Sequence, residues 1–290
     1  MNNMNFSKSF LKLAFSAAAL SSSAFILVPR DANAQAQAMP ACPATNTVTN
    51  AQFDTIGGGN GGTCKGTPDV YGLTFYEMGL CQGNPMASGT FDSSICTATF
   101  TSTGGEFHDI AGATVVLGSD AGTTRPANGT YDSPYVIISN VFTLKGSYAT
   151  TDGGTWFSDG TPQTGNTANM KNTGPAVEFK EPLTNFGGGG GGGCESKGTD
   201  SQSNGTLNAW VTDSALKEAT SCTGVSRIVG VMTLNSPIVI DDSVTGLQVD
   251  FTVENNGMTF IGHPGAPGIA TGRPFQAGSG PFAASFTLVR

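Results

Sequence analysis

Apolar residues in this chain fall in short runs, and within most runs they alternate with polar residues at a period of two. This is the side-chain period of a β-strand, whose successive residues face opposite sides of the sheet. The longest run lies between Gly129 and Gly146, and both of its alternate faces are apolar. One face carries Val136, Ile138, Phe142 and Leu144, and the other carries Tyr135, Ile137 and Val141. Two apolar faces predict a central strand that is covered on both sides.

Further runs predict strands along the whole chain. They span residues 70–81, 96–102, 113–117, 207–211, 227–234, 238–240, 247–253, 258–261 and 282–289. In the first of them, one face carries Tyr71, Leu73 and Phe75, and the opposite face carries Val70, Thr74, Tyr76 and Met78. The Asn-Asn-Gly turn at 255–257 favours a hairpin between the strands beside it. Residues 148–185 and 263–281 are expected to be turns and loops, and Asp213 is a candidate cap for a short helix through Ala219.

These elements predict an all-β protein, an antiparallel β-sandwich of immunoglobulin-like or jelly-roll-like type, built as one elaborated domain or two packed β domains. Seven consecutive glycines occupy residues 187–193. Such a run is costly to order, so we expect a flexible loop or hinge there. It would divide the chain into an N-terminal β region, residues 35–186, and a C-terminal β region, residues 194–290.

The last predicted strand is a candidate assembly element. Its face of alternating apolar residues consists of Phe282, Ala284, Phe286 and Leu288. Such a strand needs a partner sheet, either in its own chain or in another subunit, and we favour closure of its own sheet together with assembly through the surface. The segment from Thr45 to Phe53 is the other candidate for exchange between subunits.

Residues 1–34 have the features of a signal peptide. Lys8 and Lys12 precede an apolar stretch at 13–28, and Ala32-Asn33-Ala34 forms a small-x-small cleavage site. Serines interrupt the apolar stretch, and proline follows it, which disfavours a retained transmembrane anchor. We therefore expect export through the periplasm of a Gram-negative bacterium, a secreted or cell-surface location, and no membrane insertion after cleavage.

Cleavage after Ala34 would sharpen the acidic character of the chain. The whole sequence has 13 basic and 21 acidic residues, and loss of the leader leaves 10 and 20. Nucleic acids and anionic membranes bind basic patches, so neither is expected as a partner.

All six cysteines lie after the predicted leader, and an even number in an exported chain favours disulfides. Six cysteines allow 15 pairings, which the sequence alone does not distinguish. Our hypothesis is that nearest neighbours pair. This gives Cys42–Cys64, Cys81–Cys96 and Cys194–Cys222. Zinc is disfavoured because no Cys-x-x-Cys motif occurs.

Candidate catalytic groups are few. His108 and Asp109 are neighbours in sequence, but adjacent strand residues face opposite ways. The pair Asp241-Asp242 falls where a turn is expected, and Trp156 and Trp210 are more typical of a core than of a sugar-binding platform. We therefore expect a protein that is not an enzyme and uses neither a metal nor a cofactor.

Part of the chain resembles a recurrent secreted bacterial module. The resemblance covers residues 70–146 and rests on Tyr71–Cys81, a second cysteine, residues 113–118, Gly129-Thr-Tyr131 and Val136–Ser139. Such modules are similar to immunoglobulin-like and transthyretin-like sandwiches, and most have no assigned function. The resemblance implies a β-sandwich and says little about activity.

Two functions follow as hypotheses. The first is a secreted, non-enzymatic structural or adhesive cell-surface protein, with the subunit of an extracellular filament as one form; its partner would be a second copy or another surface protein. The second is an extracellular β-sandwich that binds a glycan or another ligand through glycine-rich loops and exposed aromatic residues.

Overall fold

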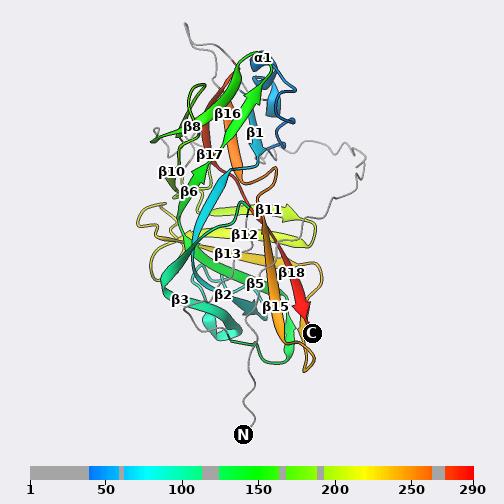
Figure 1. The fold of residues 1–290 in the computed structure, drawn as a ribbon. Coiled ribbons are helices and arrows are strands. Elements are labelled where there is room, and N and C mark those ends of the chain that lie inside the picture. The colour runs from blue at the N-terminus through cyan, green and yellow to red at the C-terminus, as the bar shows by residue number, and fades with distance from the viewer. Residues whose placement is uncertain (1–38, 59–61, 113–123, 163–167, 188–192, 263–271) are drawn as a thin grey trace, which may run out of the picture.

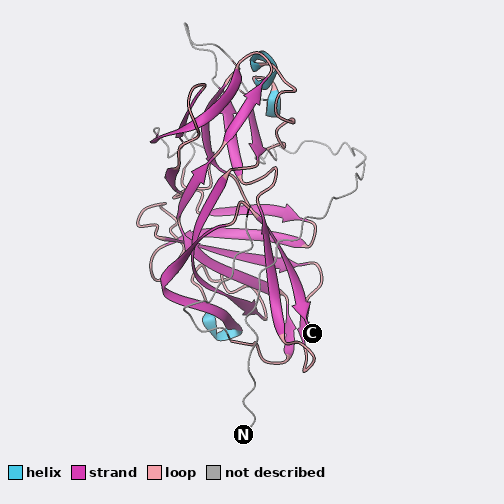
Figure 2. Cartoon of the chain, viewed as in Figure 1, coloured by secondary structure: helices cyan, strands magenta, loops and turns pink. Residues whose placement is uncertain are grey.

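The computed structural model describes residues 39–58, 62–112, 124–162, 168–187, 193–262 and 272–290. The chain is all-β and antiparallel, with three disulfides and sheets that pack in a sandwich-like way (Figure 2). Helical structure in the described ranges is confined to α1 (Asn50–Phe53) and two 3-10 turns, Ile56–Gly58 and Ser93–Ile95. None of the described helices is long and apolar enough to span a membrane.

The larger sheet has eight strands, most of which lie in the lower half of the molecule in Figure 1, while β6 and β10 extend upward beside the other sheet. Its strands are β2 (Val70–Cys81), β3 (Cys96–Asp109), β5 (Ser133–Ser139), β6 (Val141–Lys145), β10 (Phe179–Pro182), β11 (Lys197–Gln202), β12 (Gly205–Thr212) and β13 (Arg227–Leu234). Strand β2 lies between β3 and the β5–β6 pair, and β13, β12 and β11 continue the sheet beyond β5.

A six-stranded sheet forms the upper half, in the order β1-β16-β17-β9-β8-β7 (Figure 1). Its strands are β1 (Thr63–Gly66), β7 (Ser147–Thr150), β8 (Gly154–Pro162), β9 (Ala168–Lys171), β16 (Met258–Gly262) and β17 (Pro274–Ser279). Each sheet takes strands from both sides of the glycine run at 187–193, so the two sequence regions are interleaved. Residues 188–192 of that run lie outside the described ranges.

Two short ribbons complete the fold. One pairs β4 (Gly129–Tyr131) with β14 (Ile238–Ile240), and the other pairs β15 (Gly246–Thr252) with β18 (Ala283–Val289). The β15–β18 ribbon packs over one face of the large sheet, where Val249, Phe251 and Phe282 join Val136 and Ile138 in the main core. The opposite face of the sheet carries a second core, covered by the loops at 82–95 and 213–222. The loop residues in it are Met86, Phe91, Ile95 and Leu216.

The predicted central strand is confirmed. Strands β5 and β6 run along the same edge of β2 as one strand that is interrupted at Asn140, and their other edge is paired with β13 and β10. The two predicted faces separate as expected. Val136, Ile138, Phe142 and Leu144 lie in the main core, whereas Tyr135 and Ile137 lie in the second core.

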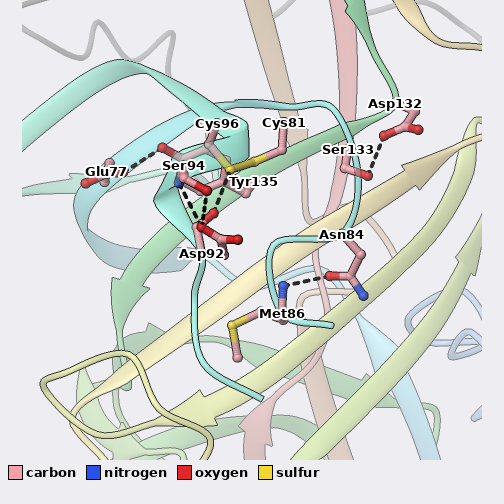
Figure 3. The surroundings of a disulfide bond; sticks show 10 residues. All are labelled: Glu77, Cys81, Asn84, Met86, Asp92, Ser94, Cys96, Asp132, Ser133 and Tyr135. Atoms are coloured by element: carbon pink, nitrogen blue, oxygen red, sulfur yellow. Dashed lines mark hydrogen bonds between the residues drawn. A yellow bond between two sulfur atoms is a disulfide. The ribbon is translucent and has the colours of Figure 1, made fainter. Parts of the chain in front are cut away.

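All three disulfides join the cysteines that our hypothesis paired, namely Cys42–Cys64, Cys81–Cys96 and Cys194–Cys222. Figure 3 shows the second of these, which ties the end of β2 to the start of β3. Beside it, the Tyr135 hydroxyl donates to Glu77 Oε1 at 2.6 Å. Burial raises the pKa of Tyr135, and the neighbouring Glu77 carboxylate raises it further.

Several local predictions are wrong, and each has a physical reason. Met78 joins Tyr71 in the main core, because a bulge between Phe75 and Glu77 reverses the alternation of faces along β2. Asp213 accepts the backbone N–H groups of Ala215 and Lys217, but they form a turn with no helix.

Longer-range pairing accounts for the other errors. The turn at 255–257 does not make a hairpin, because β15 pairs with β18 while β16 pairs with β1 and β17 in the other sheet. Strands β7 to β10 and β17 lie in the glycine- and proline-rich stretches that were expected to be loops. The predicted leader at 1–34 and the predicted strand at 113–117 lie outside the described residues.

Replacement of Ile138 by aspartate should prevent folding. Ile138 is 1% exposed, and an unpaired carboxylate there costs several kcal/mol, a large share of the roughly 5–15 kcal/mol that stabilises a domain. Circular dichroism and urea unfolding would measure the loss. Val239→Asp is the control, since Val239 is 49% exposed and its variant should unfold near the wild-type midpoint. A folded Ile138→Asp protein of wild-type stability would contradict the central role of this strand.

Candidate functional site

The β15–β18 ribbon, together with Phe282 directly before β18, contains the residues that the sequence analysis identified as candidates for assembly. Strand β18 pairs with β15 of its own chain, as the self-closing alternative predicts, with Leu288 opposite Leu247 and Phe286 opposite Val249. The marked side chains lie toward the large sheet, because Phe282 is buried in the main core and Ala284, Phe286 and Leu288 are half-buried. Phe282 makes an edge-to-face contact with Phe251, with ring centroids 5.5 Å apart.

Outside the ribbon, two amide side chains bind the second edge of β18. The Ala284 N–H donates to Gln202 Oε1 at 3.3 Å, and Asn204 Nδ2 donates to the Ala284 carbonyl at 2.9 Å. Gln202 Nε2 also donates to the Phe282 carbonyl at 3.1 Å. Both backbone groups of Ala284 therefore point away from β15.

The rest of the edge follows from the geometry of a strand. Backbone groups alternate between the two edges of a strand. Those of Phe286 and Leu288 consequently point outward like those of Ala284, while those of Ser285, Thr287 and Val289 point toward β15. Among the described strands, β18 pairs with β15 alone.

This edge lacks the usual protection against pairing. Residues 283–289, Ala-Ala-Ser-Phe-Thr-Leu-Val, contain neither a charged residue nor a proline, and these are the devices by which edge strands avoid partners. The edge strand β11 carries Lys197 and Asp200, and β15 carries Asp250. Strand β18 is therefore open to pairing with another strand.

Beneath the ribbon lies a small apolar cavity. It has a volume of about 30 Å³, and a water molecule needs roughly 10–15 Å³ by this measure. Its walls come from the large sheet and from the ribbon, including Val136, Met232, Phe251, Phe282 and Phe286. Its lining is almost entirely apolar and offers little that would orient a sugar.

A buried carboxyl group lies where the two sheets meet. Glu181 of β10 is 7% exposed, and its Oε2 accepts the backbone N–H of Ser279 in β17. The Tyr71 hydroxyl donates to the next carbonyl, that of Gly280, at 2.7 Å. Burial raises the pKa of Glu181 from 4.5 to about 7, although the hydrogen bond from Ser279 acts in the opposite direction.

Glu181 should make the free energy of unfolding depend on pH. The folded state holds the proton up to about pH 7 and the unfolded chain only to about pH 4.5. The contribution of protonated Glu181 to the free energy of unfolding is therefore fully present below pH 4.5 and is lost as the pH rises through 7. The loss is on the order of 3 kcal/mol. Glu181→Gln, which still accepts from Ser279, should remove this dependence in urea unfolding at pH 4.5, 6 and 8. The exposed Glu178→Gln is the control; if both variants follow the wild-type profile, Glu181 ionises normally in the fold.

The candidate catalytic groups are held apart in structural roles. His108 Nε2 lies 3.3 Å from Glu106 Oε2, while Asp109 Oδ1 accepts the backbone N–H groups of Tyr71 and Ala111. His108 and Asp109 therefore form no dyad. In the described ranges, no group of three or more His, Cys, Asp or Glu residues is arranged to hold a metal ion.

The remaining candidates serve a turn and the cores. Asp241 Oδ1 accepts hydrogen bonds from the backbone N–H and the hydroxyl of Ser243, and Asp242 Oδ1 accepts one from Asn128 Nδ2. Trp156 and Trp210 are 5% and 4% exposed, so their ring faces are not open to a sugar.

The other exchange candidate, Thr45–Phe53, closes the six-stranded sheet of its own chain. Just before it, the Cys42 N–H donates to the Lys65 carbonyl at the β1 edge of that sheet, 2.7 Å away. At the β7 edge, the Asn46 N–H donates to Ala149 at 2.9 Å, and Phe53 packs fully buried against Tyr148. This segment thus connects the first and last strands of the sheet.

Sequence reasoning did not identify Gln202, Asn204 or Glu181. Gln202 ends β11 and Asn204 lies in the turn that follows, about 80 residues before the strand they bind, and no local pattern marks such a contact. A lone glutamate in a short stretch with proline likewise gives no signal of burial. No protein-family model, curated protein or solved structure matches the chain.

Proposed function

We propose that this chain is an exported structural or adhesive protein of the cell surface that acts by associating with further copies of itself, with an extracellular filament as the extended form. The observation that carries the proposal is the outer edge of β18, which is uncharged, free of proline and without a strand partner among the described residues. An edge of this kind recruits another strand by backbone hydrogen bonding.

Export is supported by the leader-like residues 1–34 and by the cysteines. All six are paired in disulfides, which persist in oxidising compartments outside the cytosol. A protein working outside the cell gains stability from such cross-links, by about 2–4 kcal/mol each in the loop-entropy model. The glycan-binding alternative has less support, because Trp156 and Trp210 are buried.

Replacement of Leu288 by proline should abolish self-association and leave the fold intact. The Leu288 N–H points outward, so proline removes a donor from the free edge and none from the β15 ladder. Sedimentation velocity of the purified chain over a concentration series would show assemblies for the wild type and monomers for Leu288→Pro.

Leu288→Ala is the matched control, because it loses the same side chain and keeps the N–H. We expect it to associate like the wild type, and circular dichroism should show both variants folded. A Leu288→Pro protein that assembles as the wild type does would rule out this edge, and a wild type that stays monomeric at every concentration would rule out the proposed function.

A further inference from the structure

The free edge of β18 is short, and its hydrogen-bonding groups are fixed in position. Outward backbone groups belong to Ala284, Phe286 and Leu288, and those of Ala284 are already bound by Gln202 and Asn204. Phe286 and Leu288 therefore carry the groups available to another strand. Two outward-facing residues separated by one can form a self-complementary antiparallel pair, in which each residue exchanges hydrogen bonds with the other residue of the partner strand.

We propose that two copies of the chain pair edge to edge through β18, antiparallel, about a two-fold axis that passes beside Thr287. Phe286 of each copy then lies opposite Leu288 of the other, and each such pair exchanges two hydrogen bonds. Thr287 lies opposite its own equivalent in the close, non-hydrogen-bonded position. This inference rests on the proposed self-association and adds its partner, orientation and register.

The uncharged edge of β18 is a place where a second copy can bind without charge repulsion at the contact. The whole chain has a formal net charge of −8, so two copies repel each other except where their contact surfaces are neutral. The solvent-facing residues that would meet across the edge are Ser285, Thr287 and Val289. The β-branched threonines form a favourable cross-strand pair, and no like charges are brought together.

Gln202 and Asn204 set the register. A shift that moved the axis toward residue 285 would need the Ala284 N–H and carbonyl, which are occupied by these two amides. A shift of the axis in the opposite direction would need residues beyond Val289, where β18 ends. The register centred on Thr287 is the one that uses both remaining residues.

A two-fold contact of this kind is self-complementary and closes at two copies. A longer assembly would therefore consist of such dimers joined by a second, different contact. Loss of the β18 contact would then remove the repeating dimer.

Single cysteines test the register directly, since none of the native cysteines is free. Thr287→Cys should form a disulfide-linked dimer on mild oxidation, on the order of tenfold faster than Ser285→Cys or Val289→Cys alone, because opposite Cα atoms in the close position are about 4.5 Å apart and match disulfide geometry. A mixture of Ser285→Cys and Val289→Cys chains of different tag length should give the mixed dimer, since residues 285 and 289 lie opposite each other in this register. Non-reducing electrophoresis reads each product.

The outcomes separate this inference from the proposed function. Suppose that Leu288→Pro abolishes association, but Ser285→Cys cross-links with itself as fast as Thr287→Cys or the mixed pair fails to form. The proposed register is then wrong, while the proposed function is still supported. If Leu288→Pro leaves association unchanged, the β18 edge and its register are ruled out, whereas a wild type that stays monomeric rules out the proposed function as well. The expected cross-links, lost when Leu288→Pro is added to Thr287→Cys, would establish the two-fold pairing.

Discussion

Two-sided burial of the strand formed by β5 and β6 is the constraint on which the rest of the structure depends. Both edges of this strand are hydrogen-bonded and both faces are packed, so any displacement would break contacts in four directions. The ribbon that carries the candidate assembly edge packs on one of those faces. Its position, and the exposure of its outer edge, thus depend on the strand beneath it.

The features that local sequence does determine were predicted well. Strands β2, β13 and β14 begin and end at the residues that their apolar runs predicted. The two faces of the central strand were also assigned correctly, because alternation is set by backbone geometry alone. Neighbouring cysteines proved to be partners, since each pair is separated by only 15 to 28 residues and lies at adjoining strand ends or turns.

Pairing between distant strands was beyond local pattern. The alternation of β15 and the turn after it predict a hairpin with the next strand, but β15 pairs instead with β18, where Leu247 lies opposite Leu288. One bulge in β2 moved Met78 to the other face, and a bulge leaves no compositional trace. The terminal strand was recognised by its alternating apolar face. The amides of Gln202 and Asn204, which leave only part of its edge free, could not be recognised because their role exists only in the folded chain.

The closure of the six-stranded sheet has a consequence for the order of folding. Strand β1 pairs with β16, and β16 pairs with β17. A sheet that begins near residue 63 is therefore complete only when residues beyond 270 are available to pair. Contacts of such long sequence separation form slowly, because the entropy of closing a large loop must be overcome first. The cysteine pairs close much shorter loops. The disulfides, whose loops span 15 to 28 residues, can therefore close before the six-stranded sheet is complete.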